Sequence, residues 1–363
     1  MANESRKMVV LGAGASIGSK RYPINSSLDQ LRDRMPSAEN FFYDLFKLNK
    51  TENHNERFLN FLGLTYEALY DVIVRAWNIN KGNNDFDPNG WRGVNIEEVM
   101  TFFDVGSNMF DQDSQEGKLY RQAQKSLLDF MFPLIPMICE GQHCEYLLRV
   151  FFGLEPKDTV ISYNWDTIAE YTLAKAKANQ IRNYAKLMRS DKIEPRMYRN
   201  TGLLLKLHGS FNWMVCKNPE CPSFDTIKPP FQKNRYKLIG LNESYTCKDC
   251  GSNNLRPLIV PPVSNKMIHK DEFLKNQWLI AREKLLDTNE LIFIGYSFPP
   301  TDYYSEWLFR QIYFIENRND IKITVVNPQY GKRGSAVTKR YDTIFNDFEI
   351  ESYKTLKDFA ERN

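Results

Sequence analysis

Four cysteines in this 363-residue chain have the spacing of a metal-binding module. Cys216 and Cys221 form one close pair, Cys247 and Cys250 form a second, and 25 residues separate the pairs. Two such pairs offer the four thiolates of a tetrahedral structural Zn2+ site, and the glycine after the second pair suits a tight metal-binding turn. Unrelated core cysteines or a redox pair are the alternatives. Because all four lie in a polar, proline-containing segment, the pattern favours structural zinc.

A glycine turn follows an apolar run near the start of the chain. The sequence LGAGAS at 11–16 comes directly after Met8–Val10. Glycines at 12 and 14 would let a phosphate approach backbone N–H groups, and the amino end of a following helix would favour its negative charge. The spacing to Gly18 is one residue longer than the dinucleotide-binding fingerprint, so an ordinary tight turn remains an alternative.

Polar side chains also stand at the ends of two later apolar runs. Asn164 and Asp166 close the run at 158–164, and His208 closes the run at 203–209. Asp166, taken alone, is best interpreted as a helix cap. A histidine at the end of a buried strand is suited to general-base chemistry, although a structural role is equally compatible with the sequence.

Two further strand ends carry small or polar residues. Gly295 permits a close approach, Ser297 offers a hydroxyl and an N–H to a phosphate or ribose, and Asn327 can contact a ribose hydroxyl or an adenine edge. Each of these residues is also typical of turns. Ligands of open parallel sheets lie at the carboxyl ends of the strands, so we expect all these residues to converge there.

Buried strands alternating with helices place these residues in an α/β fold with a doubly wound, parallel, Rossmann-like sheet. We expect strands at 7–11, 158–164, 203–209, 291–297 and 321–328, and helices at 166–179, 271–286 and 303–317. The stretch 36–150 is helical in pattern, with a polar loop near 81–93 and a helix over 120–138 that Pro133 and Pro136 break. The predicted domains are a sheet domain at 1–35 and 151–363, a helical insert at 36–150 and a zinc module at 214–262.

Composition excludes several functional classes. A net charge of +3 gives no bulk electrostatic reason to expect direct nucleic-acid binding. No apolar run approaches a membrane span, and the first residues lack the pattern of a secretory signal. We therefore expect a cytoplasmic protein.

These motifs, in this order, resemble those of the Sir2 family, the sirtuins and their bacterial SIR2-like relatives, over most of the chain except the helical insert. LGAGAS resembles the family's cofactor loop, SYNWD its Gln-Asn-x-Asp motif with Tyr163 in place of glutamine, LHG its catalytic histidine, and GYS its Gly-x-Ser. The four cysteines match its zinc module. The resemblance implies NAD as substrate, held at the diphosphate by Gly12, Ala13, Gly14 and Ser16. It also implies Asp166 on the nicotinamide carboxamide, Asn164 on the ribose or a water, His208 as base, and Asn327 on the adenosine part.

The family's usual reaction uses an acyl-lysine peptide that binds as a strand. Here Pro261 and Pro262 stand where the family has Phe-Gly, and proline has no N–H for strand pairing. Water is then the simpler nucleophile, which predicts an NAD hydrolase releasing ADP-ribose and nicotinamide. The pattern resembles SIR2-like effectors of bacterial anti-phage defence, which implies oligomers or a partner such as a HerA-type ATPase. The alternatives are a protein-lysine deacylase and a non-catalytic NAD or ADP-ribose sensor.

Overall fold

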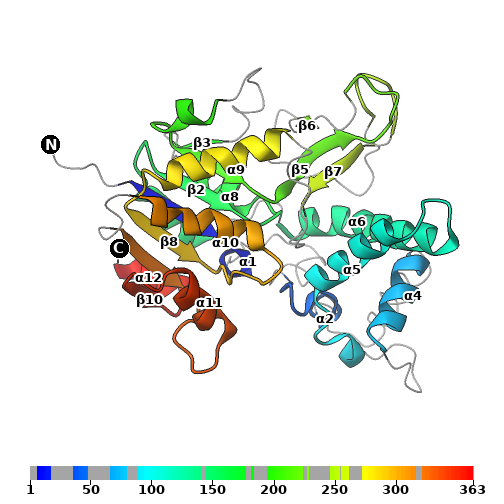
Figure 1. Ribbon diagram of the computed structural model, residues 1–363, viewed down its shortest axis with the longest axis horizontal. Coiled ribbons are helices and arrows are strands. Elements are labelled where there is room, and N and C mark those ends of the chain that lie inside the picture. The colour runs from blue at the N-terminus through cyan, green and yellow to red at the C-terminus, as the bar shows by residue number, and fades with distance from the viewer. Residues whose placement is uncertain are drawn as a thin grey trace, which may run out of the picture. The chain divides into compact units, whose positions relative to one another are not determined.

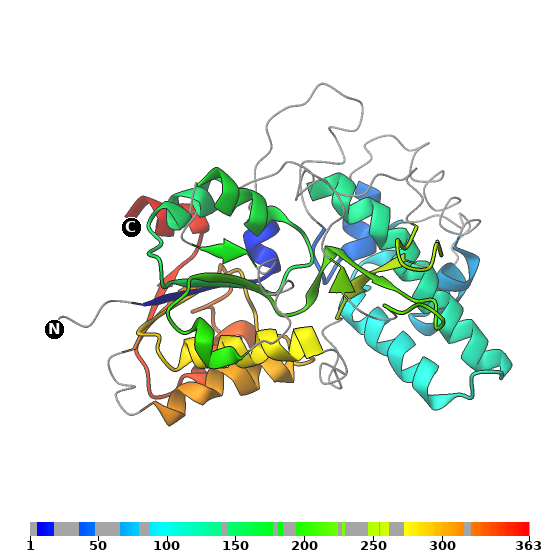
Figure 2. The same cartoon turned by 90° about the horizontal axis from the view of Figure 1, so that it is seen from above.

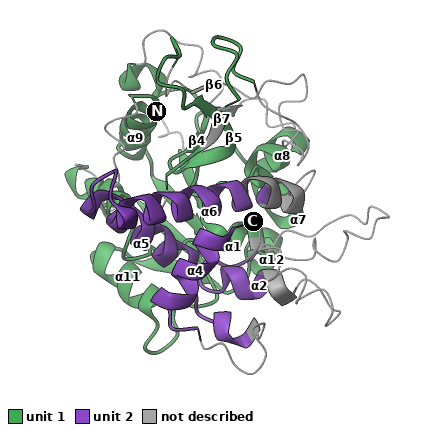
Figure 3. Ribbon diagram, turned by 90° about the vertical axis from the view of Figure 1, so that its right-hand side faces the viewer, with its two compact units in different colours: residues 1–20, 140–260, 264–363 green, residues 21–139, 261–263 purple. Residues whose placement is uncertain are grey.

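The chain folds into two compact units, which Figure 3 distinguishes by colour. The computed structural model describes residues 6–17, 36–47, 66–79, 88–139, 144–176, 181–183, 194–223, 227–228, 246–253, 255–260, 272–315 and 321–362. Unit 1 consists of residues 1–20, 140–260 and 264–363, and unit 2 of residues 21–139 and 261–263. No helix among the described residues is long and apolar enough to cross a membrane.

A seven-stranded parallel sheet forms the centre of unit 1, with strand order β10-β9-β8-β1-β2-β4-β3. The strands are β1 (Lys7–Leu11), β2 (Thr159–Ser162), β3 (Arg182–Asn183), β4 (Leu203–Lys206), β8 (Glu290–Ile294), β9 (Lys322–Val326) and β10 (Ile350–Tyr353). The chain moves outward from β1 through β2 and β4, then returns beside β1 as β8 and continues to β9 and β10. This confirms the predicted doubly wound sheet and places its topological switch point between β1 and β8 (Figure 1).

Helices cover both faces of this sheet (Figure 2). One face carries α7 (Glu145–Phe152), α8 (Ile168–Lys175) and α12 (Leu356–Arg362), and the other carries α9 (Glu272–Leu285), α10 (Tyr303–Arg310) with the 3-10 turn η6 (Gln311–Phe314), and α11 (Ala336–Ile344). The central strands are therefore buried on both sides, which explains why each reads as a continuous apolar run rather than an alternating one.

A second sheet of three antiparallel strands was not expected from the sequence. Its order is β6 (Ile227–Lys228), β5 (Gly209–Cys216), β7 (Leu255–Ile259). Only two residues separate the end of β4 from the start of β5 at Gly209, where φ is +76°. A Cβ at this position would lie 2.2 Å from the Leu258 carbonyl oxygen, so only glycine fits.

Unit 2 is helical in its described parts. It contains α2 (Phe41–Lys47), α4 (Glu67–Ala76), the 3-10 turn η2 (Pro88–Trp91), α5 (Ile96–Met109) and α6 (Gln115–Cys139). Asn95 caps α5 by accepting a hydrogen bond from the Glu97 N–H at 2.8 Å. Phe42, Trp91 and Phe103 are almost fully buried in its core.

The predicted break near the end of α6 is wrong. The helix continues through Pro133 and Pro136 to Cys139. Each proline removes only one amide donor from the helix, at a typical cost of about 3 kcal/mol. α6 packs against both α4 and α5, and its buried face includes Phe130 and Ile135 on either side of the first proline. Burial of this face offsets the lost hydrogen bonds.

Candidate active site and metal centre

The loops that follow β1 and β8 are packed directly against each other at the switch point. The Gly12 N–H donates to the Ile294 carbonyl and the Gly14 N–H to the Gly295 carbonyl, each at 3.0 Å. A Cβ on Gly12 would lie 2.5 Å from the Tyr296 Cα, and a Cβ on Gly14 would lie 2.7 Å from the Gly295 Cα. These glycines are thus required for packing, whether or not a phosphate binds beside them.

This packing limits which loop amides can hold an anion. The N–H groups of Gly12, Gly14 and Ala15 all donate to backbone carbonyls. Ala13 and Gly14 are exposed, and Ala13 opens the short helix α1 (Ala13–Ile17). Within the described loop, Ala13 therefore offers the amide that is best placed for a ligand.

Three predicted site residues form one hydrogen-bonded network across the ends of β1 and β2. The Asn164 Nδ2 donates to the Gly12 carbonyl at 2.9 Å and to the Ser16 Oγ at 2.8 Å, and the Ser16 Oγ donates to the Asp166 Oδ2 at 2.6 Å. Both amide hydrogens of Asn164 are thereby used, so its Oδ1 is the atom that remains to contact a ligand. Asn164 is half-buried, whereas Ser16 and Asp166 are buried.

Asp166 forms the turn that leads into α8 and has a second role as well, whereas the N-cap residue of this helix is Thr167. The Asp166 Oδ1 accepts a hydrogen bond from the Ile168 N–H at 2.9 Å at the start of α8, while its Oδ2 accepts from Ser16. The turn and the network therefore use different oxygens of one carboxylate, so Asp166 can serve both.

A buried ion pair supports this network from below. The Lys206 Nζ lies 3.4 Å from the Glu170 Oε1, and both side chains have no solvent exposure. The same ammonium donates a short hydrogen bond to the Asp166 carbonyl oxygen. Sequence analysis missed this lysine because its partners, on α8 and in the preceding loop, are distant in sequence.

His208 lies on the strand next to Asn164. β2 and β4 pair in parallel with Ser162 opposite Lys206, so Asn164 and His208 occupy equivalent positions, two residues beyond the last pair. The imidazole is 4% exposed, and its Nε2 lies 3.2 Å from the Asp302 Oδ2. The Tyr163 ring packs edge-on against it, with ring centres 4.8 Å apart.

Asp302 and Tyr296 are site residues that sequence analysis did not identify. The Tyr296 hydroxyl donates to the Asp302 Oδ2 at 2.7 Å, and the Tyr296 ring stacks on Tyr163 with centres 4.5 Å apart. Burial, followed by the charge of Asp302, raises the pKa values of both tyrosines well above 10. Both phenols therefore stay neutral.

The remaining two predicted contacts differ in character. Ser297 is exposed beside Gly295, where φ is +61°. Asn327 is buried: its Nδ2 donates to the Tyr296 carbonyl at 3.2 Å, and its Oδ1 accepts from the Gln329 N–H at 2.9 Å. Asn327 thus holds the ends of β8 and β9 together, as the turn interpretation predicts.

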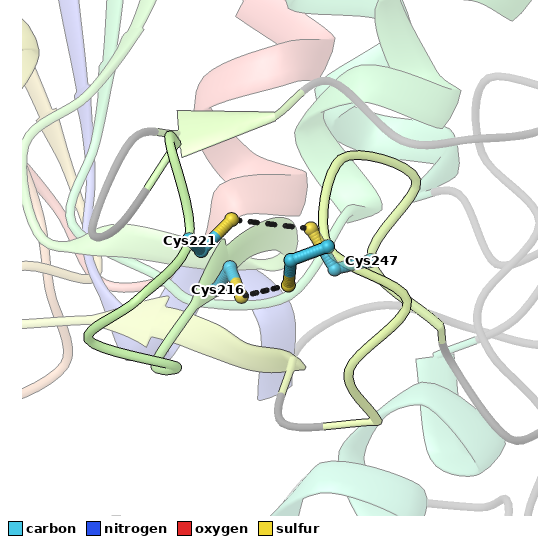
Figure 4. Close-up of side chains that lie close together, drawn as sticks. Cys216, Cys221 and Cys247 are labelled. Atoms are coloured by element: carbon cyan, nitrogen blue, oxygen red, sulfur yellow. Dashed lines mark hydrogen bonds between the residues drawn. The ribbon is translucent and has the colours of Figure 1, made fainter.

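The four cysteines of the predicted module come together on the three-stranded sheet. Their sulfur atoms all lie within 4.8 Å of one another, and the pairs Cys216–Cys250 and Cys221–Cys247 are each 3.7 Å apart (Figure 4). Four sulfurs around a tetrahedral zinc with bonds of about 2.3 Å are separated by about 3.8 Å. The cluster therefore has the dimensions and the ligand set of a zinc site.

The backbone around one of these thiols favours its metal-binding form. The N–H of Asp249 is the largest of several influences that lower the pKa of Cys247 to about 6, whereas burial raises the pKa of its neighbour Cys221 to about 12. Because the thiolate is the form that binds metal, Cys247 is prepared for a cation at neutral pH.

No family model matches this chain, and no match is found among curated proteins. Among solved structures, it is similar to a Sir2 enzyme described for its mechanism and regulation, with 14% identity, a TM-score of 0.38, and coverage of 70% of this chain and 79% of the other. It is also similar to Sir2 in complex with EX-527, 2'-O-acetyl-ADP-ribose and a deacetylated p53 peptide, with 17% identity, a TM-score of 0.37, and coverage of 72% and 83%. A third similar structure is Sir2 bound to an acetylated peptide, with 15% identity, a TM-score of 0.36, and coverage of 73% and 82%.

Proposed function

We propose that this protein is an NAD hydrolase that cleaves the nicotinamide–ribose bond with water as the nucleophile. The observation that carries the proposal is the linked set Ser16–Asn164–Asp166 at the ends of β1 and β2, with His208 at the equivalent position after β4. This edge of a doubly wound sheet is where such folds bind ligands. It combines a carboxylate, an amide oxygen and an imidazole, the groups that glycosidic cleavage of a cationic nucleoside requires.

In the proposed reaction the bond between ribose C1' and the nicotinamide nitrogen breaks, and its electron pair leaves with neutral nicotinamide. The ribose then has oxocarbenium character, which the partial negative charge of the Asn164 Oδ1 favours. Water attacks C1' and loses a proton to His208, giving ADP-ribose. Asp166 keeps lone pairs on both oxygens to accept the carboxamide N–H of nicotinamide.

The proposed substrate contacts follow the sequence resemblance. The loop residues Gly12, Ala13, Gly14 and Ser16 would hold the diphosphate, with Ala13 giving its amide directly. Gly295, Ser297 and Asn327 would line the remainder of NAD. Because the Asn327 amide is used in structural hydrogen bonds, we expect it to contribute through one remaining Nδ2 hydrogen or by shape.

We further propose that the enzyme is an anti-phage effector of the cytoplasm, silent until it assembles with itself or with a partner such as a HerA-type ATPase. Its zinc would be structural, since the four cysteines complete a tetrahedral set and leave no open coordination position. Depletion of NAD, rather than modification of a protein, would be the output.

A protein-lysine deacylase is the second candidate. β7 lies at the edge of the three-stranded sheet among the described strands, so an acyl-lysine peptide could pair with it as an added strand. Pro261 and Pro262, which follow β7 in the sequence after Val260, lie outside the described residues. A deacylase requires the peptide for turnover and yields O-acyl-ADP-ribose, which distinguishes it from the hydrolase.

The test is nicotinamide release from NAD by the purified chain, with and without its genomic neighbour, and with and without an acyl-lysine peptide. We expect peptide-independent release that Asn164→Ala and His208→Ala each abolish. Asn346→Ala is the matched control, since this exposed asparagine accepts a hydrogen bond from the Tyr313 hydroxyl and follows α11, outside the proposed site. Release at the parental rate by both site variants would refute the assignment.

A further inference from the structure

We propose that Asp302 is a positioning residue for His208: its carboxylate accepts the Nε2 hydrogen of the imidazole and so makes Nδ1 the basic nitrogen. The inference rests on the proposed function, because it assigns the atom that receives the proton of water. The sequence resemblance supplies no role for Asp302.

The first observation is that Asp302 stands in a helix-capping position without acting as a cap. It is the N-cap residue of α10, yet its side chain makes no capping hydrogen bond to that helix. Its Oδ2 instead lies 3.2 Å from the His208 Nε2 and accepts from the Tyr296 hydroxyl at 2.7 Å. Aspartate commonly caps helices, but the Asp302 side chain contacts His208 instead.

The second observation is that the pair is buried. Asp302 is 1% exposed and His208 is 4% exposed. A buried carboxylate must be stabilised to remain charged, and here two donors share one oxygen at the amino end of α10, where the helix dipole favours negative charge. A charged Asp302 in turn stabilises the imidazolium that forms when His208 takes up a proton.

The third observation is that the ring cannot easily turn away. Tyr163 packs edge-on against it, and Trp278 lies with its ring centre 6.4 Å away. Trp278 is itself fixed, since its indole N–H donates to the Leu207 carbonyl at 3.1 Å. Asp302 and Tyr163 are titratable groups that contact the ring, and burial raises the pKa of the Tyr163 phenol well above 10, so the phenol stays neutral.

The proton balance of the proposed step is simple. Water gives its oxygen to ribose C1' and one proton to the His208 Nδ1, while the Nε2 hydrogen stays between His208 and Asp302. Nicotinamide leaves without needing a proton. Release of the proton from Nδ1 to solvent restores the neutral ring, so Asp302 remains a carboxylate throughout.

The experiment compares Asp302→Asn with the full-length parent in two ways. Selective 15N labelling of histidine reports which ring nitrogen carries the hydrogen, and the chain has only four histidines, so His208→Gln identifies the signal. We expect the parent to show hydrogen at Nε2 and Asp302→Asn to lose this preference. Activity should fall by about 100-fold or more in kcat with little change in KM.

The pH profile provides a readout that a merely structural role would not move. Asp302→Asn removes a neighbouring negative charge, so the acid limb of kcat/KM should move to lower pH. Tyr296→Phe keeps the stacked ring but removes one donor to Asp302, which strengthens the hold of the carboxylate on the imidazolium and should move the limb to higher pH. If Asp302→Asn folds poorly, the shift to higher pH expected of Tyr296→Phe still tests the proposal, and an unmoved limb in that variant would contradict it.

Asp158→Asn is the matched control. Asp158 is also fully buried and accepts hydrogen bonds from the Lys7 and Glu155 N–H groups at 2.7 Å, but it precedes β2 at the opposite end of the sheet. It should leave the tautomer and the pH profile as in the parent. An unchanged His208 tautomer in Asp302→Asn would overturn the proposal. Absence of NAD cleavage by the parent even with its genomic neighbour present would instead refute the proposed function, and the NMR comparison would still decide the role of Asp302.

Discussion

Replacement of Lys206 by methionine should strongly destabilise unit 1. Its Nζ lies 3.4 Å from the Glu170 Oε1 with both side chains fully buried, and at an effective dielectric constant of about 20 this separation corresponds to about 5 kcal/mol of attraction. Methionine matches the length of lysine but leaves the Glu170 carboxylate buried without its cation. Removing one member of a buried pair typically costs about 3–5 kcal/mol.

The measurement is thermal and urea unfolding of the parent and of Lys206→Met. For a folding unit of this size, the expected loss lowers the Tm by about 6–20 °C. Lys357→Met is the matched control, because its Nζ lies 3.9 Å from the Glu361 Oε1 in an exposed pair on α12. Such surface pairs contribute about 0.5 kcal/mol or less, so this variant should unfold within about 2 °C of the parent.

A double variant separates charge from packing. Adding Glu170→Gln to Lys206→Met removes the buried charge that has lost its lysine, so it should restore part of the lost stability. The reasoning is refuted if Lys206→Met costs less than about 1 kcal/mol, or if the double variant is no more stable than the single one. Because Lys206 also donates to the Asp166 carbonyl, loss of NAD cleavage should accompany the loss of stability.

Three further predictions concern other parts of the molecule. Gly295→Ala should cost several kcal/mol more than Gly331→Ala: both glycines have positive φ, but only the new Cβ at 295 meets backbone, 2.4 Å from the Ala15 N, and equal melting temperatures would contradict this. The purified chain should contain one zinc per molecule by elemental analysis, Cys221→Ser should lose it and Cys144→Ser should retain it, and a chain without zinc would contradict the metal assignment. Burial lowers the pKa of Lys284 from 10.5 to about 8, so the folded chain binds fewer protons than the unfolded chain between these values and the free energy of unfolding should rise with pH across this window. Denaturation from pH 7 to 10 should show this rise, up to about 3 kcal/mol, in the parent relative to Lys284→Met, and a constant difference between the two would contradict it.

The parts of the fold that were predictable from sequence are those with a strong local signal. Strands such as β1 and β8 are buried on both faces, so their apolar runs identify them, and the glycines that follow identify the turns. The observed strands are shorter than predicted: β2 ends at Ser162 and β4 at Lys206, because the polar residues beyond leave the ladder to form the site.

The small antiparallel sheet was not predictable for the opposite reason. β5 continues from β4 after a two-residue turn, so one apolar stretch serves two sheets with different partners. The change of sheet depends on Gly209 and on the approach of Leu258, about 50 residues later in the chain. The local pattern of apolar residues cannot predict a contact between residues so far apart in the sequence.

The glycine turn at 12 and 14 was predicted from the sequence, but the sequence did not reveal why both residues must be glycine. Their spacing indicated a turn suited to phosphate, and the structure shows that contact with the β8 loop already demands glycine at both positions. The loop amides of Gly12 and Gly14 are used in that contact, so an anion would depend more on Ala13 than the motif implies.

Asp302 presents the clearest limit of sequence analysis for the site itself. An aspartate directly before a helical run such as YYSEWLFR is the ordinary sign of a helix cap, and that local explanation removes any reason to look further. Its contact with His208 joins residues that are 94 positions apart in the sequence. The contact forms because the end of β4 and the loop after β8 lie close together in the folded chain. Only the structure shows that the carboxylate at this cap position makes no capping hydrogen bond. Its contact with Nε2 of His208 is the basis for the proposal that Nδ1 is the basic nitrogen.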